Sequence, residues 1–195
     1  GYFASHLQIS AGFDKMLPVG HPYIQTFLKM RESFGAGDRI AIALLERDGD
    51  IFSEDFFEKL RKVHEQLFLL PGVYRPSVRS IFSPDVRYID IVEGGFAGGP
   101  IVPPDFKPSP EMFARVKQNI VKGEQEGNLV ANRFVGALIT ADLQTKGSDG
   151  KPVDYRLIAK TLEDIRAKYQ SKDIEVRIIG FAKSTGDIAE GARSV

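Results

Sequence analysis

The fold of this chain is decided by residues 39–72, which read RIAIALLERDGDIFSEDFFEKLRKVHEQLFLLPG. Residues 39–47 carry apolar side chains on both faces of an alternating pattern, which predicts a central strand covered on both sides. After an acidic turn at 48–50, apolar residues recur every three or four positions as far as Pro71, which predicts an amphipathic helix. A buried strand followed by such a helix indicates a layered fold of sheet and helices.

The rest of the chain continues this alternation of strands and helices. When residues 83–133 are set aside as an insertion, the elements follow in the order strand, helix, strand, strand, helix, strand. This order predicts an α+β fold of the ferredoxin-like, split βαβ type (βαββαβ), with a mainly antiparallel sheet and helices on one face. The long loop-and-helix insertion then falls between the second and third core strands. The further elements are predicted as strands near residues 74–82, 86–92, 135–143 and 174–179, and as helices over 110–122 and from Asp154 to Tyr169.

Three regions are expected along the chain. The N-terminal segment covers residues 1–37 and contains a predicted helix over 22–34. The ferredoxin-like domain covers residues 38–182 and includes the insertion at 83–133. Residues 183–195 are small and polar, which predicts a C-terminal linker.

The composition disfavours several classes of function. The 26 basic and 26 acidic residues cancel, so no positive excess is available to neutralise a nucleic-acid backbone. The absence of cysteine removes disulfides, thiol catalysis and cysteine-based zinc sites. No apolar run approaches the roughly 18–20 residues that span a bilayer. Nucleic acid is therefore not expected among the partners.

The patterns typical of metal binding, nucleotide binding and nucleophilic catalysis are also missing. The three histidines, His6, His21 and His64, lack the short spacing of a zinc site. The glycines at 94–99 are followed by Pro100 rather than by the Lys-Ser/Thr of a phosphate-binding loop. No Gly-x-Ser-x-Gly elbow occurs. We therefore expect no metal, no cofactor and no catalytic residue, and interpret the chain as a protein that is not an enzyme.

The stretch 94–110 holds four glycines and five prolines. Because proline cannot donate to a sheet ladder, this composition predicts a long irregular loop, and such loops are often functional. We interpret it as a gate over a pocket. Alanine at Gly95 and Gly98 is expected to change ligand binding while leaving the fold intact. The candidate gate residues are Gly94, Gly95, Gly98 and Gly99.

Aromatic residues are concentrated in and around the insertion. Aromatic side chains with few polar neighbours suit an apolar ligand, so this group is the candidate ligand-binding site. The alternative is that the same residues pack the insertion onto the sheet. The candidates are Phe82, Tyr88, Phe96, Phe106 and Phe113.

Several short motifs in a fixed order resemble one known family. Between about residues 21 and 192, the chain is similar to the first large extracytoplasmic loop of transporters of the RND superfamily, in the MMPL-like branch. The motifs are scaffold motifs and assign no catalytic residue. They are His21-Pro22-Tyr23-Ile24, Asp38-Arg39-Ile40-Ala41-Ile42-Ala43-Leu44-Leu45, Asp48-Gly49-Asp50-Ile51-Phe52, Leu69-Leu70-Pro71-Gly72-Val73, Ile101-Val102-Pro103-Pro104-Asp105-Phe106, Val116-Lys117-Gln118-Asn119-Ile120, Gly127-Asn128-Leu129-Val130-Ala131-Asn132 and Ile178-Ile179-Gly180-Phe181-Ala182-Lys183.

The resemblance implies a periplasmic domain of an inner-membrane transporter that uses the proton gradient. Such porter domains have ferredoxin-like subdomains and accept apolar or amphipathic molecules, including sterol-, hopanoid- or fatty-acid-like lipids. Segments 1–37 and 183–195 would lead from and to the membrane, and the proton-relaying acidic residues would lie outside this sequence. The implied partners are a lipid, the second porter domain of the same transporter, a periplasmic carrier or adaptor, and a second copy of the chain.

Two other readings stay open from the sequence. The first is a structural docking domain that contacts a partner or protomer without binding substrate. The second is a small enzyme on a ferredoxin-like scaffold, which would require titratable groups gathered in one pocket. Aromatic residues that line a cavity favour ligand binding, whereas aromatic residues in an exposed patch favour docking. The identity of the lipid, the direction of transport and the oligomeric state do not follow from the sequence.

Overall fold

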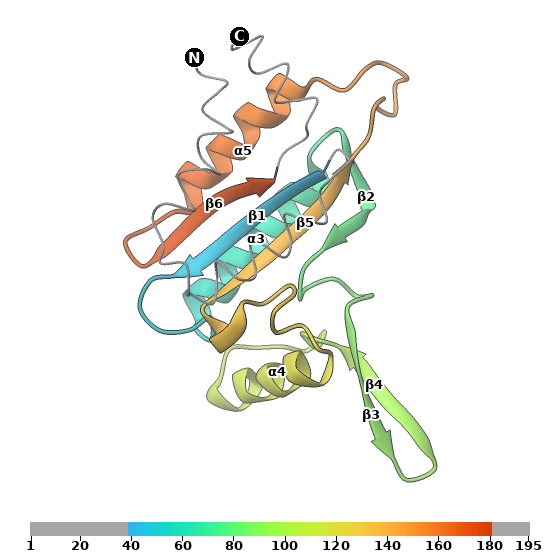
Figure 1. The fold of residues 1–195 in the computed structure, drawn as a ribbon, viewed down its shortest axis with the longest axis vertical. Helices are drawn as coiled ribbons and strands as arrows, with labels where there is room; N and C mark the ends of the chain where they lie inside the picture. The colour runs from blue at the N-terminus through green and yellow to red at the C-terminus, as the bar shows by residue number, and fades with distance from the viewer. Residues whose placement is uncertain (1–38, 181–195) are drawn as a thin grey trace.

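The computed structural model describes residues 39–180 (Figure 1). The helix expected over 22–34 and the linker expected over 183–195 lie outside these residues. The described part contains two antiparallel sheets and α-helices, which confirms the α+β class. Its elements are β1 (Arg39–Glu46), α3 (Glu54–Leu69), β2 (Val73–Arg79), β3 (Arg87–Val92), β4 (Gly95–Pro100), α4 (Pro110–Lys122), the 3₁₀ turn η1 (Asn132–Phe134), β5 (Gly136–Leu143), α5 (Tyr155–Tyr169) and β6 (Ile174–Gly180).

The four-stranded sheet has the order β2-β5-β1-β6, and its neighbouring strands all run antiparallel. β1 lies between β5 and β6, so that Ile42 faces Ile139 on one side and Ile178 on the other. Residues 40–44 are fully buried. The prediction of a central strand that is covered on both faces is therefore confirmed.

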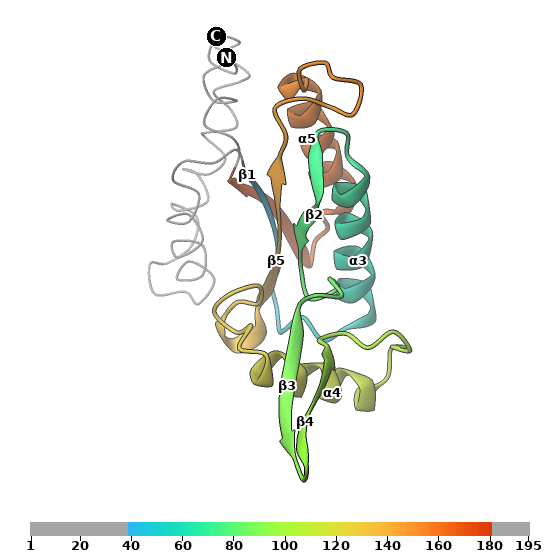
Figure 2. The same cartoon turned by 90° about the vertical axis from the view of Figure 1, so that its right-hand side faces the viewer.

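The two long helices lie on the same side of this sheet (Figure 2). α3 begins at Ser53, whose Oγ accepts a hydrogen bond from the Phe56 amide at 3.1 Å. α5 begins at Asp154, whose carboxylate accepts hydrogen bonds from the amides of the second and third residues of the helix. These caps satisfy amides that have no partner within the helix, and both helices begin where the sequence predicts.

The insertion consists of β3, β4 and α4, and it packs at one end of the four-stranded sheet (Figure 1). α4 begins at Ser109, whose Oγ caps the Met112 amide. The buried Asn119 of α4 donates to the carbonyl of Ile101 at 2.9 Å, and this hydrogen bond joins the helix to the chain that follows β4.

The prediction of an irregular loop over 94–110 is wrong for its first part. Residues Gly95–Pro100 form β4, which pairs in register with β3 from Val92↔Gly95 to Arg87↔Pro100. The turn between the strands is Glu93-Gly94, and Gly94 has a φ of +90°, which glycine adopts without steric penalty. Only the last residue of β4 is a proline, so the missing amide donor does not interrupt the ladder.

His64 on α3 contacts the turn that follows β2. Its Nδ1 lies 2.7 Å from the Oγ of Ser80, a buried hydroxyl that also accepts the amide hydrogen of Phe82 at 3.0 Å. Burial lowers the pKa of the His64 imidazole below its ordinary value, although the negative charge of Glu65 acts in the opposite direction. The folded protein therefore favours the neutral imidazole.

We expect the free energy of unfolding to decrease as the pH falls below about 6.5, the ordinary pKa of histidine. The unfolded chain binds a proton at His64 before the folded chain does, so protonation favours unfolding until the pH passes below the folded-state pKa. The variant His64→Gln should lack this contribution. Denaturant unfolding of both proteins between pH 7 and pH 5 measures it, and equal pH slopes would contradict the interpretation.

Candidate functional site

The five candidate aromatic residues separate into two groups. Phe82, Phe106 and Phe113 gather around Phe57 of α3, with ring centroids 5.9, 5.3 and 5.0 Å from its ring. Phe52 extends this aromatic cluster at 6.2 Å from Phe57. These three residues are partly buried and packed against the core. They contact helix α3, whereas the alternative left open by the sequence was packing of the insertion onto the sheet.

A small cavity of about 230 Å³ opens beside this aromatic cluster. Phe57, Phe82 and Phe106 line it together with charged residues of α3. This cavity is smaller than ordinary ligand pockets, which measure roughly 300–1,000 Å³. Ligand binding at these rings stays a prediction.

The other two aromatic residues, Tyr88 and Phe96, lie on the hairpin formed by β3 and β4. Side chains directly opposite each other share one face of a hairpin. The register places Ile91 opposite Phe96 and Ile89 opposite Gly98. Ile89, Ile91 and Phe96 are 67%, 84% and 79% exposed. We call this surface the apolar face of the hairpin.

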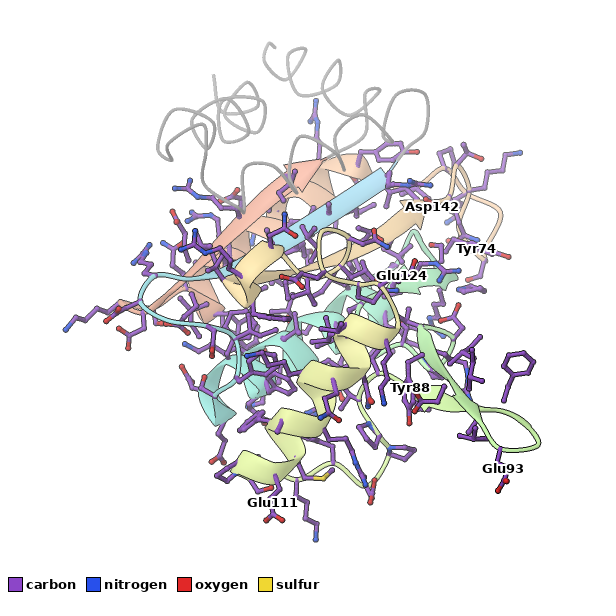
Figure 3. The ribbon with its side chains drawn as sticks, turned by 60° about the horizontal axis from the view of Figure 1, so that its bottom comes forward. Tyr74, Tyr88, Glu93, Glu111, Glu124 and Asp142 are labelled. Atoms are coloured by element: carbon purple, nitrogen blue, oxygen red, sulfur yellow. The ribbon has the colours of Figure 1, made fainter. Side chains whose placement is uncertain are left out.

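The opposite face of the hairpin is turned toward α4. The Nζ of Lys122 lies 3.0 Å from a carboxylate oxygen of Asp90 and 5.9 Å from the centre of the Tyr88 ring. Figure 3 shows Tyr88 near the start of the hairpin and Glu93 at its far tip. The hairpin is thus fixed at its base, while its apolar face is exposed.

A shallow hollow of about 430 Å³ lies on the hairpin between Ile89 and Phe96. Gly98 is among its lining residues, and a Cβ at this position would lie only 2.2 Å from the carbonyl oxygen of Tyr88. Glycine is therefore required by the close approach of the two backbones. At Gly99, in contrast, a Cβ would meet the Tyr88 ring at an ordinary 3.7 Å.

The four candidate gate glycines thus belong to a paired hairpin rather than to a loop. Gly94 forms the turn, and Gly95 has a φ of +150°, which L side chains rarely adopt. The expectation that alanine at Gly95 and Gly98 leaves the fold intact is wrong at Gly98, where the Cβ has no room. A gating movement of this segment stays a prediction.

A second, larger cavity of about 630 Å³ lies at the base of the hairpin, and we call it the basic cavity. It contains two ion pairs, Arg39–Asp142 at 2.8 Å and Arg79–Asp85 at 3.3 Å. Arg87 also lines it, and this residue borders the hollow on the hairpin as well. The lining residues are Arg39, Ser77, Arg79, Asp85, Val86, Arg87, Gln125, Asn128, Leu129, Thr140 and Asp142.

Sequence reasoning missed the basic cavity because its residues come from distant parts of the chain. Arg39 opens β1 and Arg79 ends β2, and both strands pair with β5. Arg87 opens β3, which belongs to the separate two-stranded sheet. No local motif signals such a cluster. The apolar face of the hairpin did have a signal, since Arg87, Ile89 and Ile91 alternate with Tyr88 and Asp90.

Between residues 39 and 180, no three His, Asp or Glu side chains come together in a way that could hold a metal ion. None of the helices in this range is both long and apolar enough to cross a membrane. The comparisons with models of protein families and with curated proteins give no significant match for this chain.

If Phe57 is the centre of a packed core, Phe57→Ala should lower the free energy of unfolding by about 3–5 kcal/mol. Phe57 is 3% exposed, whereas Phe68 on the same helix is 39% exposed and has the Arg75 guanidinium 5.6 Å from its ring centroid. The matched control Phe68→Ala should change stability by less than about 1 kcal/mol. Chemical denaturation measures both, and similar losses would contradict the central role of Phe57.

Gly98→Ala should open the β3–β4 ladder, because the added Cβ overlaps the Tyr88 carbonyl. Overpacking of this kind typically costs about 1–3 kcal/mol, which corresponds to roughly 5- to 150-fold faster amide exchange in the hairpin. Gly99→Ala is the control and should exchange at nearly the wild-type rate. Hydrogen exchange followed by NMR tests both, and unchanged protection in Gly98→Ala would contradict the close backbone approach.

Proposed function

We propose that this chain is the periplasmic substrate-binding or conduit domain of an inner-membrane RND-type transporter of the MMPL-like branch, and that it binds apolar lipids of the sterol, hopanoid or fatty-acid kind. The observation that carries the proposal is the apolar face of the hairpin, where Ile89, Ile91 and Phe96 are exposed around a hollow. Contiguous exposed apolar surface on a folded domain marks a site of interaction.

The topology supports a ferredoxin-like domain, as the resemblance implies. In the order β2-β5-β1-β6, the unit β1-α3-β2 has β5 between its two strands, and the unit β5-α5-β6 has β1 between its two strands. Two interleaved units of this kind form the split βαβ arrangement. The fold is compatible with many functions, so the weight of the proposal rests on the hairpin.

The energetics fit a ligand that is held and then released. Covering about 100 Å² of apolar surface contributes roughly 2.5 kcal/mol before the entropy of association is subtracted. Conduction requires binding strong enough for entry and weak enough for exit. An open hollow on a hairpin meets both conditions better than a closed cavity, because the ligand remains accessible to the next surface along its path.

The second candidate is a docking domain, and the high exposure of Ile91 and Phe96 favours it. In this case the hairpin would contact the second porter domain, a periplasmic carrier or adaptor, or another protomer. A standard protein interface buries about 800 Å² on each partner. The exposed apolar side chains of the hairpin present roughly a few hundred Å², which matches a lipid more closely than a complete protein interface.

The test uses the double variant Ile89→Ser/Phe96→Ser, titrated with a fluorescent sterol and a fluorescent fatty acid below the concentrations at which they aggregate. Removing two apolar contacts of about 1 kcal/mol each should weaken lipid binding by roughly 10- to 30-fold. The control is Leu157→Ser, which removes an exposed apolar side chain from α5. Unchanged lipid affinity in the double variant would refute the hairpin as the site. If no lipid binds but the hairpin variant abolishes self-association in sedimentation, docking replaces lipid binding as the conclusion.

A further inference from the structure

We propose that the basic cavity binds the anionic headgroup of an amphiphile, a carboxylate or a phosphate, whose hydrocarbon chain lies along the apolar face of the hairpin. The inference rests on the proposed function and gives its ligand a chemical class. It assigns a role to the arginines of the basic cavity, which the binding of a purely apolar lipid would not require.

The basic cavity contains more arginine side chains than carboxylates. Three guanidinium groups line it, against the two carboxylates of Asp85 and Asp142. Each carboxylate already has an arginine partner, Arg79 and Arg39 respectively. Within residues 39–180 no ion pair to a carboxylate involves Arg87, which donates only a long 3.4 Å hydrogen bond to the carbonyl of Pro84. Among the lining residues within 39–180, the arginines outnumber the carboxylates by one.

Arginine is a side chain well suited to binding a carboxylate or a phosphate. The planar fork of an arginine matches the paired oxygens of a carboxylate or phosphate, and such contacts are stronger than neutral hydrogen bonds. Uncharged polar groups also line the cavity, including the buried Thr140 and the amide side chains of Gln125 and Asn128. A bound anion would therefore meet hydrogen-bond donors of more than one kind.

Arg87 lies between the basic cavity and the apolar face of the hairpin. It opens β3 on the same face as Ile89 and Ile91, because alternate residues of a strand share a face. From residue 87 to residue 91 the strand advances roughly 13 Å, at about 3.3 Å per residue. A charged end and an apolar path are thus continuous. Figure 3 shows Glu93 at the far tip of the hairpin, away from Asp142 of the basic cavity.

The exposure of the ion pairs distinguishes an amphiphile from a free anion. The side chains of Arg39, Asp142, Arg79 and Asp85 are between 37% and 56% exposed, so water and salt screen the attraction for any anion in the cavity. A free anion would be held weakly here. A hydrocarbon chain on the adjoining apolar face adds the burial that the charges alone do not supply.

The test compares two lipids with the same chain and the same glycerol backbone, on the full 195-residue chain. Oleoyl lysophosphatidic acid carries a phosphate, whereas monooleoylglycerol is neutral, and both are used below their aggregation concentrations. We expect the phosphate lipid to bind about five- to tenfold more tightly at low ionic strength, with the difference shrinking as salt is added. Arg87→Gln should remove most of this preference, measured as the ratio of the two affinities, and should abolish its dependence on salt.

The control variant is Arg156→Gln, which removes the same charge from an exposed position on α5 and should keep the preference. Equal affinity for both lipids, insensitive to salt and to Arg87→Gln, would overturn the headgroup site while leaving apolar binding intact. Binding of inorganic phosphate as tight as that of the phosphate lipid would also overturn it, since the chain would then contribute nothing. Failure of both lipids to bind would refute the proposed function itself.

Discussion

The structure depends on the burial of β1. This strand is apolar on both faces and paired along both edges, with β5 on one side and β6 on the other. Each helical crossover starts from one of the two central strands, β1 or β5, and ends on an outer strand. Both crossovers therefore start from the central pair of strands, and a polar side chain in the middle of β1 would lose contact with water on every side.

The aromatic cluster around Phe57 packs the insertion against the core of the domain. Its rings come from α3, α4 and the connecting segments, and the centroids of neighbouring rings lie between 5.0 and 6.4 Å apart. The cluster thereby sets the position of α4, and Lys122 of α4 in turn holds the base of the hairpin. A two-stranded sheet is only marginally stable by itself. The proposed site therefore lies on the least buried part of the domain, but it is fixed at one end to a well-packed core.

Much of the framework could be predicted from the sequence because local patterns encode it. The alternation in residues 39–47, the spacing of apolar residues in α3 and the cap at Asp154 all correspond to observed elements. β4 was not predictable in this way, since three of its six residues are glycine and leave no side-chain alternation to detect. Phe113 carried a usable signal, because its place on the same helix face as Val116 and Ile120 indicated packing. The basic cavity depends on strand order, which no single segment contains.

The hollow on the hairpin has a floor made of main chain. Where the two strands approach most closely, no residue other than glycine fits at position 98, so substitution cannot deepen or fill the hollow there. Its walls, in contrast, are ordinary side chains at positions 89 and 96. Substitutions that reshape the hollow would therefore fall at positions 89 and 96, whereas position 98 would stay glycine.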